Sequence, residues 1–407
     1  MKKNEVYLLC LLFLFAFSLR CYDFSYPSFR WADENAHVPA ATNYIENGQF
    51  EPDFWEHPPL RHLILYGFLQ IFGDNPYGWR MRNILFGAAA VVLTYLFARK
   101  ISGSRDVALM AALLLSSDPL HIVLSRYTFE EVYGGAVFLA AVILFLMHEK
   151  RSSILVLSAF VMGCALAIKW YYVPCWLLLF GLLLRDDENY RQPGLVLFFT
   201  ATYILIPLTV FIASYYQWFG RGYSFPEFLD FITSAYYSLQ KYTPKNFQAG
   251  MIFLSHPSSL EWFFKPVIVG QGTYLEGDRG EFILYMNNLP IWILVVPSMI
   301  ATTVLAVRDK SLALAIPVLL FCGSYLLFLT VKRPVFIYSA ATLLPFAFTA
   351  LAVVTARVAD RYGARFYYCM LAIMLAWNLY LYPFATAKKV PIAPYRYLLE
   401  KADIVLQ

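Results

Sequence analysis

The sequence predicts an all-α polytopic membrane protein with about eleven transmembrane helices. Of its 407 residues, 60% are hydrophobic and only 14% are charged, whereas an ordinary soluble domain is roughly 45–50% apolar and 25% charged. Apolar runs recur along the whole chain with short polar breaks, and about 20 apolar residues in a helix cross the hydrocarbon core of a bilayer. We therefore expect a single transmembrane domain over residues 1–384 and a short extracytoplasmic tail over residues 385–407.

The candidate spans follow the apolar runs in order. They cover approximately residues 6–20, 80–98, 107–124, 131–148, 152–168, 172–184, 194–216, 289–307, 311–330, 335–356 and 365–383. The first run has the basic start of a signal peptide but no A-x-A-like cleavage site. We therefore predict that it is retained as the first span.

The basic residues set the orientation of these spans. Loops on the cytoplasmic side of a membrane protein carry an excess of Lys and Arg, and with a cytoplasmic N-terminus every predicted inside loop is basic. Those loops hold Lys2, Lys3, Arg99, Lys100, Arg105, Lys150, Arg151, Arg185, Arg191, Arg308, Lys310, Arg357, Arg361 and Arg365. Because orientation accounts for the net charge of +5, we expect no nucleic-acid partner.

Residues 58–73 form an apolar run that is about 16 residues long, which is short for a span. A span there would also place the basic loop at residues 99–105 outside. We therefore predict a juxtamembrane helix on the outer surface, with Pro58 or Pro59 in its first turn. Two long outer segments remain, at about residues 21–79 and 217–288, and the second carries a helical apolar pattern from Phe228 to Leu239 that is typical of an interfacial helix.

Ionisable groups that orientation does not explain gather on the predicted outer face. The first outer segment contains WADENAH at residues 31–37 and WEHPPLRH at residues 55–62. The shorter outer turns add Asp118, His121, Arg126, Glu130, Glu131, Lys169, Lys332 and Arg333. Any one of these groups could decorate a solvated loop, but together, near the ends of spans where water reaches them, they predict a site above the helix bundle.

This combination of groups suits the chemistry of a phosphate-activated lipid. A carboxylate such as Asp33 can act as general base toward a hydroxyl group, an effect typically worth about 10²–10⁴ in rate. Guanidinium and ammonium groups hold phosphate through charge-assisted hydrogen bonds. At the membrane surface, the tail of such a donor would stay in lipid while its head group met the acids and bases outside.

The order of motifs resembles the protein O-mannosyltransferase and aminoarabinose transferase branch of the C-type glycosyltransferases, which are polytopic enzymes that use polyprenyl-phosphate sugars. Asp33-Glu34 resembles the acidic pair of the family. The other matching pieces are Glu56-His57-Pro58-Pro59-Leu60, similar to an HPPL or KPPL string, the arginine-led segment at residues 80–87, Ser125-Arg126-Tyr127 with Glu130-Glu131, and Lys169-Trp170.

Three later segments favour the mannosyltransferase side of this branch. They are His256 to Trp262, Asn288 to Trp292, and Arg333 to Tyr338. His37 lies one position later than the histidine of the mannosyltransferase D-E-x-H pattern, and Ser339 stands where a histidine usually follows Tyr338. The lumenal carbohydrate-binding-like domain of eukaryotic members is not recognised, which fits a bacterial or archaeal cell membrane.

The resemblance implies a role for each matching residue. It implies that Asp33 is the catalytic base and that Glu34 orients it or the acceptor. It implies that donor phosphate is held by Arg80, Lys169, His57 or Arg82, with Arg80 favoured. Arg126, Glu130, Glu131 and Arg333 would support the site. Glu56 and His256 match the metal-contacting acid and histidine of the aminoarabinose branch, so a divalent Zn or Mn ion is the one cofactor implied.

The resulting hypothesis is a glycosyltransferase that moves mannose or another hexose-like sugar, with inversion, from a polyprenyl-phosphate donor to a hydroxyl of a protein or glycolipid at the outer membrane face. The alternatives are a lipid-linked sugar flippase or small-molecule transporter, and a scaffold without activity. Transporters tend to carry ionisable groups near the midplane, whereas these acids cluster outside. Helix-dipole stabilisation by Asp33-Glu34 and snorkelling of Arg80, Arg82 and Lys169 are the non-catalytic explanations.

Overall fold

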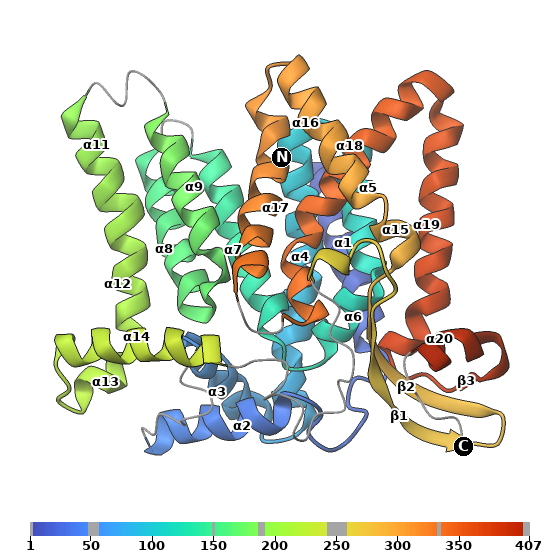
Figure 1. The fold of residues 1–407 in the computed structure, drawn as a ribbon, viewed down its shortest axis with the longest axis horizontal. Helices are drawn as coiled ribbons and strands as arrows, with labels where there is room; N and C mark the ends of the chain where they lie inside the picture. The colour runs from blue at the N-terminus through green and yellow to red at the C-terminus, as the bar shows by residue number, and fades with distance from the viewer. Residues whose placement is uncertain are drawn as a thin grey trace.

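The computed structural model describes residues 3–47, 57–148, 151–185, 192–241, 259–331 and 335–401. Long helices run side by side in a bundle, and short helices and a small sheet gather at one end of it (Figure 1). We call this end the α2 end, after the helix that follows the acidic pair. The N-terminus of α1 and the connections from α16 to α17 and from α18 to α19 lie toward the opposite end (Figure 1).

The elements follow one another along the chain with these bounds. The first half contains α1 (Lys3–Cys21), α2 (Glu34–Thr42), the π-helix η1 (Asn43–Asn47), α3 (Leu60–Phe72), α4 (Pro76–Ser102), α5 (Arg105–Ser117), α6 (Pro119–Arg126), α7 (Glu130–Met147), α8 (Ser152–Ile168), η2 (Trp170–Tyr172) and α9 (Val173–Leu184). The second half contains α11 (Pro193–Thr200), η3 (Ala201–Leu205), α12 (Ile206–Ala213), α13 (Tyr216–Gly220), α14 (Phe225–Lys241), η4 (Ser259–Glu261), β1 (Ile268–Glu276), β2 (Arg279–Met286), α15 (Leu289–Trp292), α16 (Val295–Arg308), α17 (Leu312–Thr330), η5 (Ile337–Thr342), α18 (Leu344–Tyr362), α19 (Ala364–Ala385), β3 (Val390–Pro391), η6 (Ala393–Tyr395) and α20 (Arg396–Lys401).

Each predicted span range contains helix in the structure. By length and composition, seven of the described helices are able to cross a membrane, or eight if the bent pair α5–α6 counts as one span. Helices α8 and α9 are apolar but shorter. The protein is therefore a mostly helical multi-pass membrane protein, while the predicted number of eleven spans stays a prediction. The predicted tenth span begins later than expected, because residues 337–342 form a 3₁₀ helix before α18 starts at Leu344.

The predicted span at residues 107–124 is broken at Asp118. Helices α5 and α6 meet there at 57°. Asp118 precedes Pro119 and adopts an extended backbone, as the proline ring requires of the residue before it. Its carboxylate then caps α6 by accepting a hydrogen bond from the backbone N–H of His121 at 3.0 Å. The run therefore forms two helices, and α6 leads directly into the loop that carries Tyr127 to Phe129.

Helix α4 is the central element that positions the site. Its first turns lie at the α2 end (Figure 1). The amide of Asn83 donates to the carbonyls of Leu124 at 3.2 Å and Phe129 at 2.7 Å, so α4 fixes the loop between α6 and α7. At Gly87 a Cβ atom would lie 2.4 Å from Oγ of Ser125 and 3.0 Å from Nε of Arg20. Close packing of α1, α4 and α6 therefore depends on this glycine.

The prediction of an all-α fold is wrong in one region. Strands β1 and β2 form an antiparallel hairpin through Gly277, whose φ is +59°, and β3 adds to β2 by pairing Val390 with Gly280. A Gly-Asp pair followed by the run FILYM is a hairpin signal. The run is short and leads directly into the next apolar segment, so hydropathy alone does not separate this hairpin from a span.

Two predicted surface helices are confirmed as helices. The first, α3, has only 13 residues and begins directly after Pro59. The second, α14, covers Phe225–Lys241 and runs across the end of α12 at the α2 end (Figure 1). Their predicted place in the membrane interface stays a prediction.

Replacing Gly87 with alanine is expected to destabilise the protein. The added Cβ would clash with Ser125 and Arg20, and overpacking of this kind costs typically 1–3 kcal/mol. The measurement is the thermal unfolding temperature of the purified protein in one detergent. Gly67→Ala is the matched control, since within the part of the chain that the structure describes a Cβ there meets no atom within 4 Å and helical Ala is favoured over Gly. Equal melting temperatures for the two variants would contradict the packing at Gly87.

Candidate functional site

The acidic pair lies where a tight loop enters α2. Ala32 has a φ of +49°, in the left-handed region that residues other than glycine seldom occupy. Asp33 follows as the N-cap residue of α2, and Glu34 is its first helical residue. The backbone N–H of Trp31 donates to Oε2 of Glu34 at 2.9 Å, which closes the loop onto the helix. Because Asp33 and Glu34 are adjacent on this turn, their carboxylates have different surroundings.

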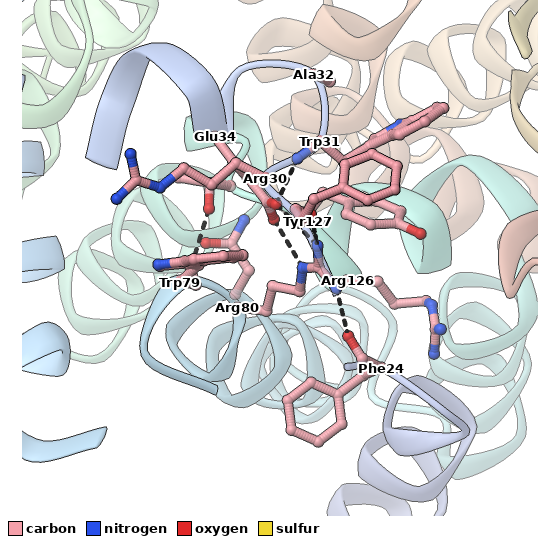
Figure 2. A network of polar contacts seen from close by, with 12 residues as sticks. Phe24, Arg30, Trp31, Ala32, Glu34, Trp79, Arg80, Arg126 and Tyr127 are labelled. Atoms are coloured by element: carbon pink, nitrogen blue, oxygen red, sulfur yellow. Dashed lines mark hydrogen bonds and ion pairs between the residues drawn. The ribbon is translucent and has the colours of Figure 1, made fainter. Parts of the chain in front are cut away.

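Glu34 is completely buried in a forked ion pair with Arg80 of α4. The Nε and Nη2 atoms of Arg80 each donate to one carboxylate oxygen of Glu34 at 2.9 Å. The same guanidinium donates to the carbonyl of Phe24 at 2.9 Å (Figure 2) and to the carbonyl of Phe29 at 3.1 Å. Its charge also lies 5.1 Å from the ring of Tyr127. Arg80 therefore ties the whole loop before α2 to the central helix.

Asp33 keeps 45% of its side chain accessible, unlike its neighbour Glu34. Desolvation by the surrounding protein raises the pKa of Asp33 to about 7, and the carboxylates of Glu130 and Glu131 add to the rise. Lys169 and Arg61 oppose it. An accessible carboxyl whose pKa is near neutrality is able to take up and release a proton at physiological pH.

A buried cluster of charges lies beside Asp33. Glu130, in the first turn of α7, contacts Nη1 of Arg61 at 2.8 Å, Nε2 of His37 at 3.1 Å and Nζ of Lys169 at 3.5 Å. Lys169 also lies 2.5 Å from Glu131 and 4.7 Å from the ring of Tyr171. His37, Arg61 and Lys169 come from α2, α3 and the segment after α8, so three separate elements converge on Glu130 of α7.

The structure gives the other predicted site residues the following places. Arg82 is buried in α4 with its guanidinium 4.0 Å from the ring of Tyr133, and it donates to the carbonyl of Arg61 at 3.3 Å. Arg126 donates to the carbonyls of Arg20 at 2.9 Å and Asp23 at 3.1 Å, so it holds the end of α1. His57 lies within electrostatic range of Glu130.

Three predicted site residues, Glu56, His256 and Arg333, lie outside the described residues. The predicted metal site therefore stays a prediction. Among the residues that are described, no group of three or more His, Cys, Asp or Glu side chains is arranged to hold a metal ion.

Sequence reasoning missed Arg61, which stands four residues after His57 in WEHPPLRH. It is almost completely buried and binds the carboxylate of Glu130. A signal was present, because Arg61 falls in the first turn of an apolar surface helix, where an isolated charge needs a partner. The partner, Glu130, is 69 residues away, so the sequence alone could not identify the pair.

Comparisons with known proteins agree with the predicted resemblance. Residues 56–214 match the family described as dolichyl-phosphate-mannose-protein mannosyltransferase. A polyprenol-phosphate-mannose–protein mannosyltransferase of Mycobacterium tuberculosis is 24% identical over 90% of this chain and 85% of its own length. The corresponding protein of Corynebacterium glutamicum is 23% identical over 73% of this chain and 69% of its own length.

Other relatives match over a smaller part. An uncharacterized protein of Aquifex aeolicus is 29% identical over 46% of this chain, and the match spans 39% of that protein. The chain likewise spans 44% of a polyprenol-phosphate-mannose–protein mannosyltransferase of Mycolicibacterium smegmatis.

Two solved structures share the fold. The S. cerevisiae protein O-mannosyltransferase Pmt1–Pmt2 complex bound to the sugar donor has a TM-score of 0.78 at 12% identity, covering 100% of this chain and 93% of that one. ArnT from Cupriavidus metallidurans bound to undecaprenyl phosphate has a TM-score of 0.63 at 14% identity, and the match covers 95% of this chain and 77% of that one. The predicted resemblance to C-type glycosyltransferases of the mannosyltransferase and ArnT branch is thus confirmed.

Breaking the Glu34–Arg80 pair from one side is expected to destabilise the protein strongly. Removing one partner of a buried ion pair leaves an uncompensated charge, at a cost of about 3–5 kcal/mol. We expect Glu34→Gln and Arg80→Met each to lower the thermal unfolding temperature by several degrees, and the double variant to lose less than the sum of the two. The measurement is thermal unfolding of the three purified variants.

Arg30→Ala is the matched control for this cycle. Arg30 pairs with Asp74 at 2.7 Å, but the two side chains are 30% and 59% exposed, and exposed pairs contribute roughly 0–1 kcal/mol. Strict additivity of Glu34→Gln and Arg80→Met would show that the two side chains are not coupled.

Proposed function

We propose that this chain, whose sequence and fold are similar to those of C-type glycosyltransferases, is an integral membrane glycosyltransferase. It transfers mannose or another hexose-like sugar from a polyprenyl-phosphate donor to a hydroxyl group of a protein or glycolipid. The observation that carries the proposal is the accessible carboxyl of Asp33, held on a left-handed turn by the buried Glu34–Arg80 pair and facing a cluster of buried cations. Two relatives, matched over 85% and 69% of their own length, are polyprenol-phosphate-mannose–protein mannosyltransferases, and their names specify a donor of this kind.

Asp33 is the general base in this proposal. Its carboxylate removes the proton from the acceptor hydroxyl while the acceptor oxygen attacks C1 of the sugar. A bond forms between that oxygen and C1, the bond from C1 to the phosphate oxygen breaks, and the electron pair leaves with the phosphate. A single displacement of this kind inverts the configuration at C1. A pKa near 7 suits Asp33 to this task, because the base is then largely unprotonated just above neutral pH.

Glu34 and Arg80 position the base in this mechanism. Arg80 makes four hydrogen bonds to Glu34, Phe24 and Phe29, and an arginine has five N–H donors in total. Four of the five are therefore engaged within the protein. We accordingly propose a positioning role for Arg80 in place of the phosphate contact that the resemblance implies.

Lys169 is the candidate for the leaving phosphate. Its Nζ lies between Glu130 and Glu131, and Lys169 acts electrostatically on Asp33. An ammonium group has three donors, so the two carboxylates leave it able to bind a phosphate oxygen. Arg61 and Arg82 add positive charge in the same cluster, which would stabilise the phosphate as its charge grows.

The α2 end would face the outside of the cell membrane. The connections at the opposite end carry basic residues, among them Arg99, Lys100, Arg308 and Arg361, as the positive-inside rule requires of cytoplasmic loops. The lipid tail of the donor would then stay in the outer leaflet, and its sugar phosphate would reach Asp33 at the α2 end.

Asp33→Asn is the direct test of the proposed function. The amide keeps the shape of the side chain but cannot accept the proton, so sugar transfer should fall by about 10²–10⁴-fold. The measurement is transfer of label from a panel of polyprenyl-phosphate sugars, including polyprenyl-phosphate mannose, into the protein and glycolipid fractions of a membrane extract.

Asp360→Asn serves as the control, because Asp360 is exposed near the end of α18 at the opposite end of the bundle. It should transfer sugar at the wild-type rate. Turnover by Asp33→Asn within a few-fold of wild type would exclude Asp33 as the base. Movement of donor across liposomes without consumption by the wild-type protein would instead indicate a flippase.

Transfer should depend on pH with an acidic limb near pH 7. The base acts only when it is unprotonated, so kcat/KM should fall as the pH drops through the pKa of Asp33, about 7. The stability of the fold should change in the opposite direction and fall as the pH rises. A carboxyl whose pKa is raised in the folded state binds its proton more tightly when folded, so its contribution to stability is lost as the pH rises from about 4 to 7.

The pH dependence of kcat/KM and that of thermal unfolding can both be measured on one preparation of each protein. Asp33→Asn should remove this part of the pH dependence of thermal unfolding and should be more stable than wild type at pH 8. A limb at pH 4 to 5, with no difference in unfolding between the two proteins, would show that Asp33 titrates as an ordinary surface carboxyl.

A further inference from the structure

We propose that His37 is a positioning residue that locks the helix bearing Asp33 onto α3 and α7, and that it does so as a neutral ring that never takes the substrate proton. The inference rests on the proposed function, because the group that it positions is the proposed base. His37 stands one residue away from the histidine of the related sequence pattern, so its role has to be read from its contacts in this chain.

Both ring nitrogens of His37 are directed at charged groups on other helices. Its Nε2 atom lies 3.1 Å from Oε1 of Glu130 on α7. Its Nδ1 atom lies 3.4 Å from Nη1 of Arg61 on α3. The same Nη1 atom donates to the same Oε1 atom of Glu130 at 2.8 Å. His37, Arg61 and Glu130 therefore form a closed triangle that joins α2, α3 and α7, and we call it the His37 triangle.

The partners of His37 fix its tautomer. Arginine is a donor only, so Nδ1 of His37 must accept from Arg61, and a neutral imidazole then carries its hydrogen on Nε2. That hydrogen is donated to the carboxylate of Glu130. Burial lowers the pKa of His37 to about 3 in spite of the Glu130 carboxylate, and Arg61 lowers it further. A ring that is neutral at physiological pH and has both nitrogens engaged is suited to holding a geometry.

The His37 triangle acts on Asp33 through the geometry of α2. Asp33 and His37 are four residues apart, so they lie on one face of the helix, with Oδ2 of Asp33 4.0 Å from Nε2 of His37. While α2 is locked, Asp33 stays close to Glu130. If the lock is removed, α2 loses its contacts with α3 and α7 and is held mainly by the Glu34–Arg80 pair, so the Asp33 carboxyl can shift away from Glu130 and become more exposed to water.

The titratable groups near Asp33 lie on several of the described elements. They are His37 on α2, Arg61 on α3, Glu130 and Glu131 on α7, Lys169 after α8, Tyr285 on β2 and Tyr338 in η5. Desolvation, the largest influence, and the two glutamates raise the pKa of the carboxyl. Loosening α2 weakens both effects, so the acidic limb of the activity should move to lower pH.

The test compares His37→Ala and His37→Gln with wild type in the full-length protein. Transfer from polyprenyl-phosphate mannose, or from whichever panel donor the wild type uses, is measured as kcat and KM across pH 5 to 9. Glutamine keeps an acceptor and a donor for Arg61 and Glu130, but it cannot serve as a base near neutral pH. His148→Gln is the control, since His148 follows α7 at the opposite end of the bundle.

His37→Ala should lower kcat by about 10²-fold, the loss that a 1 Å misplacement of a reacting group can cause, with little change in KM for the donor. Its acidic limb should lie at lower pH than that of wild type. His37→Gln should retain most of the activity and the wild-type limb, and His148→Gln should match wild type. Thermal unfolding of each variant shows how much of any loss of kcat is due to unfolded protein. A smaller folded fraction alone does not shift the acidic limb of the pH profile.

Three results would overturn the role of His37. One is an unchanged limb in His37→Ala after correction for the folded fraction. Another is wild-type kcat in His37→Ala. The third is loss in His37→Gln as complete as in Asp33→Asn, which would make the ring itself a proton acceptor. A wild-type protein that transfers no sugar from any donor would instead contradict the proposed function, and the unfolding data would then still show whether the His37 triangle stabilises α2.

Discussion

The buried ion pair between Glu34 and Arg80 is the contact on which the rest of the site depends. It joins the loop before α2 to the central helix of the bundle, and the same guanidinium holds two carbonyls of that loop. Both charges lie out of water, where an ion pair is stable only with good geometry and further hydrogen bonds. The forked contact at 2.9 Å provides both, and it leaves the adjacent Asp33 accessible on a turn whose backbone is fixed.

The sequence predicted the course of the helices well because their signal is local. Apolar runs and basic loops are set by the bilayer, and each of the eleven expected ranges contains helix in the structure. The predictions fail where a helix break or a contact between distant parts of the chain determines the structure. Asp118-Pro119 breaks one run at 57°, which hydropathy does not register. The β1–β2 hairpin is held partly by β3, more than 100 residues later in the chain, and a contact at that separation leaves no periodic signal.

The site likewise has a part that the sequence could predict and a part that it could not. Asp33, Glu34, Glu130, Glu131 and Lys169 could be placed at one end of the bundle from topology, and the structure brings them together. The partners could not be foreseen. Arg80, expected to hold phosphate, is engaged by Glu34 and two carbonyls, and Arg61, not considered, binds Glu130. Pairing between buried charges depends on side-chain directions from helices that are far apart in sequence.

Desolvation explains why so many charges surround one carboxyl. Partial desolvation favours the neutral form of Asp33 and raises its pKa to about 7, while the deeper burial of its neighbours would make any isolated charge among them costly. The three neighbouring carboxylates are accordingly paired, Glu34 with Arg80, Glu130 with Arg61 and Glu131 with Lys169. Of these four carboxylates, Asp33 is the one without such a close cationic partner among the described residues, and the neutral ring of His37 lies 4.0 Å from it. Pairing it as closely would stabilise the fold and lower its pKa, and a carboxylate with a lowered pKa would be a weaker base toward a hydroxyl group.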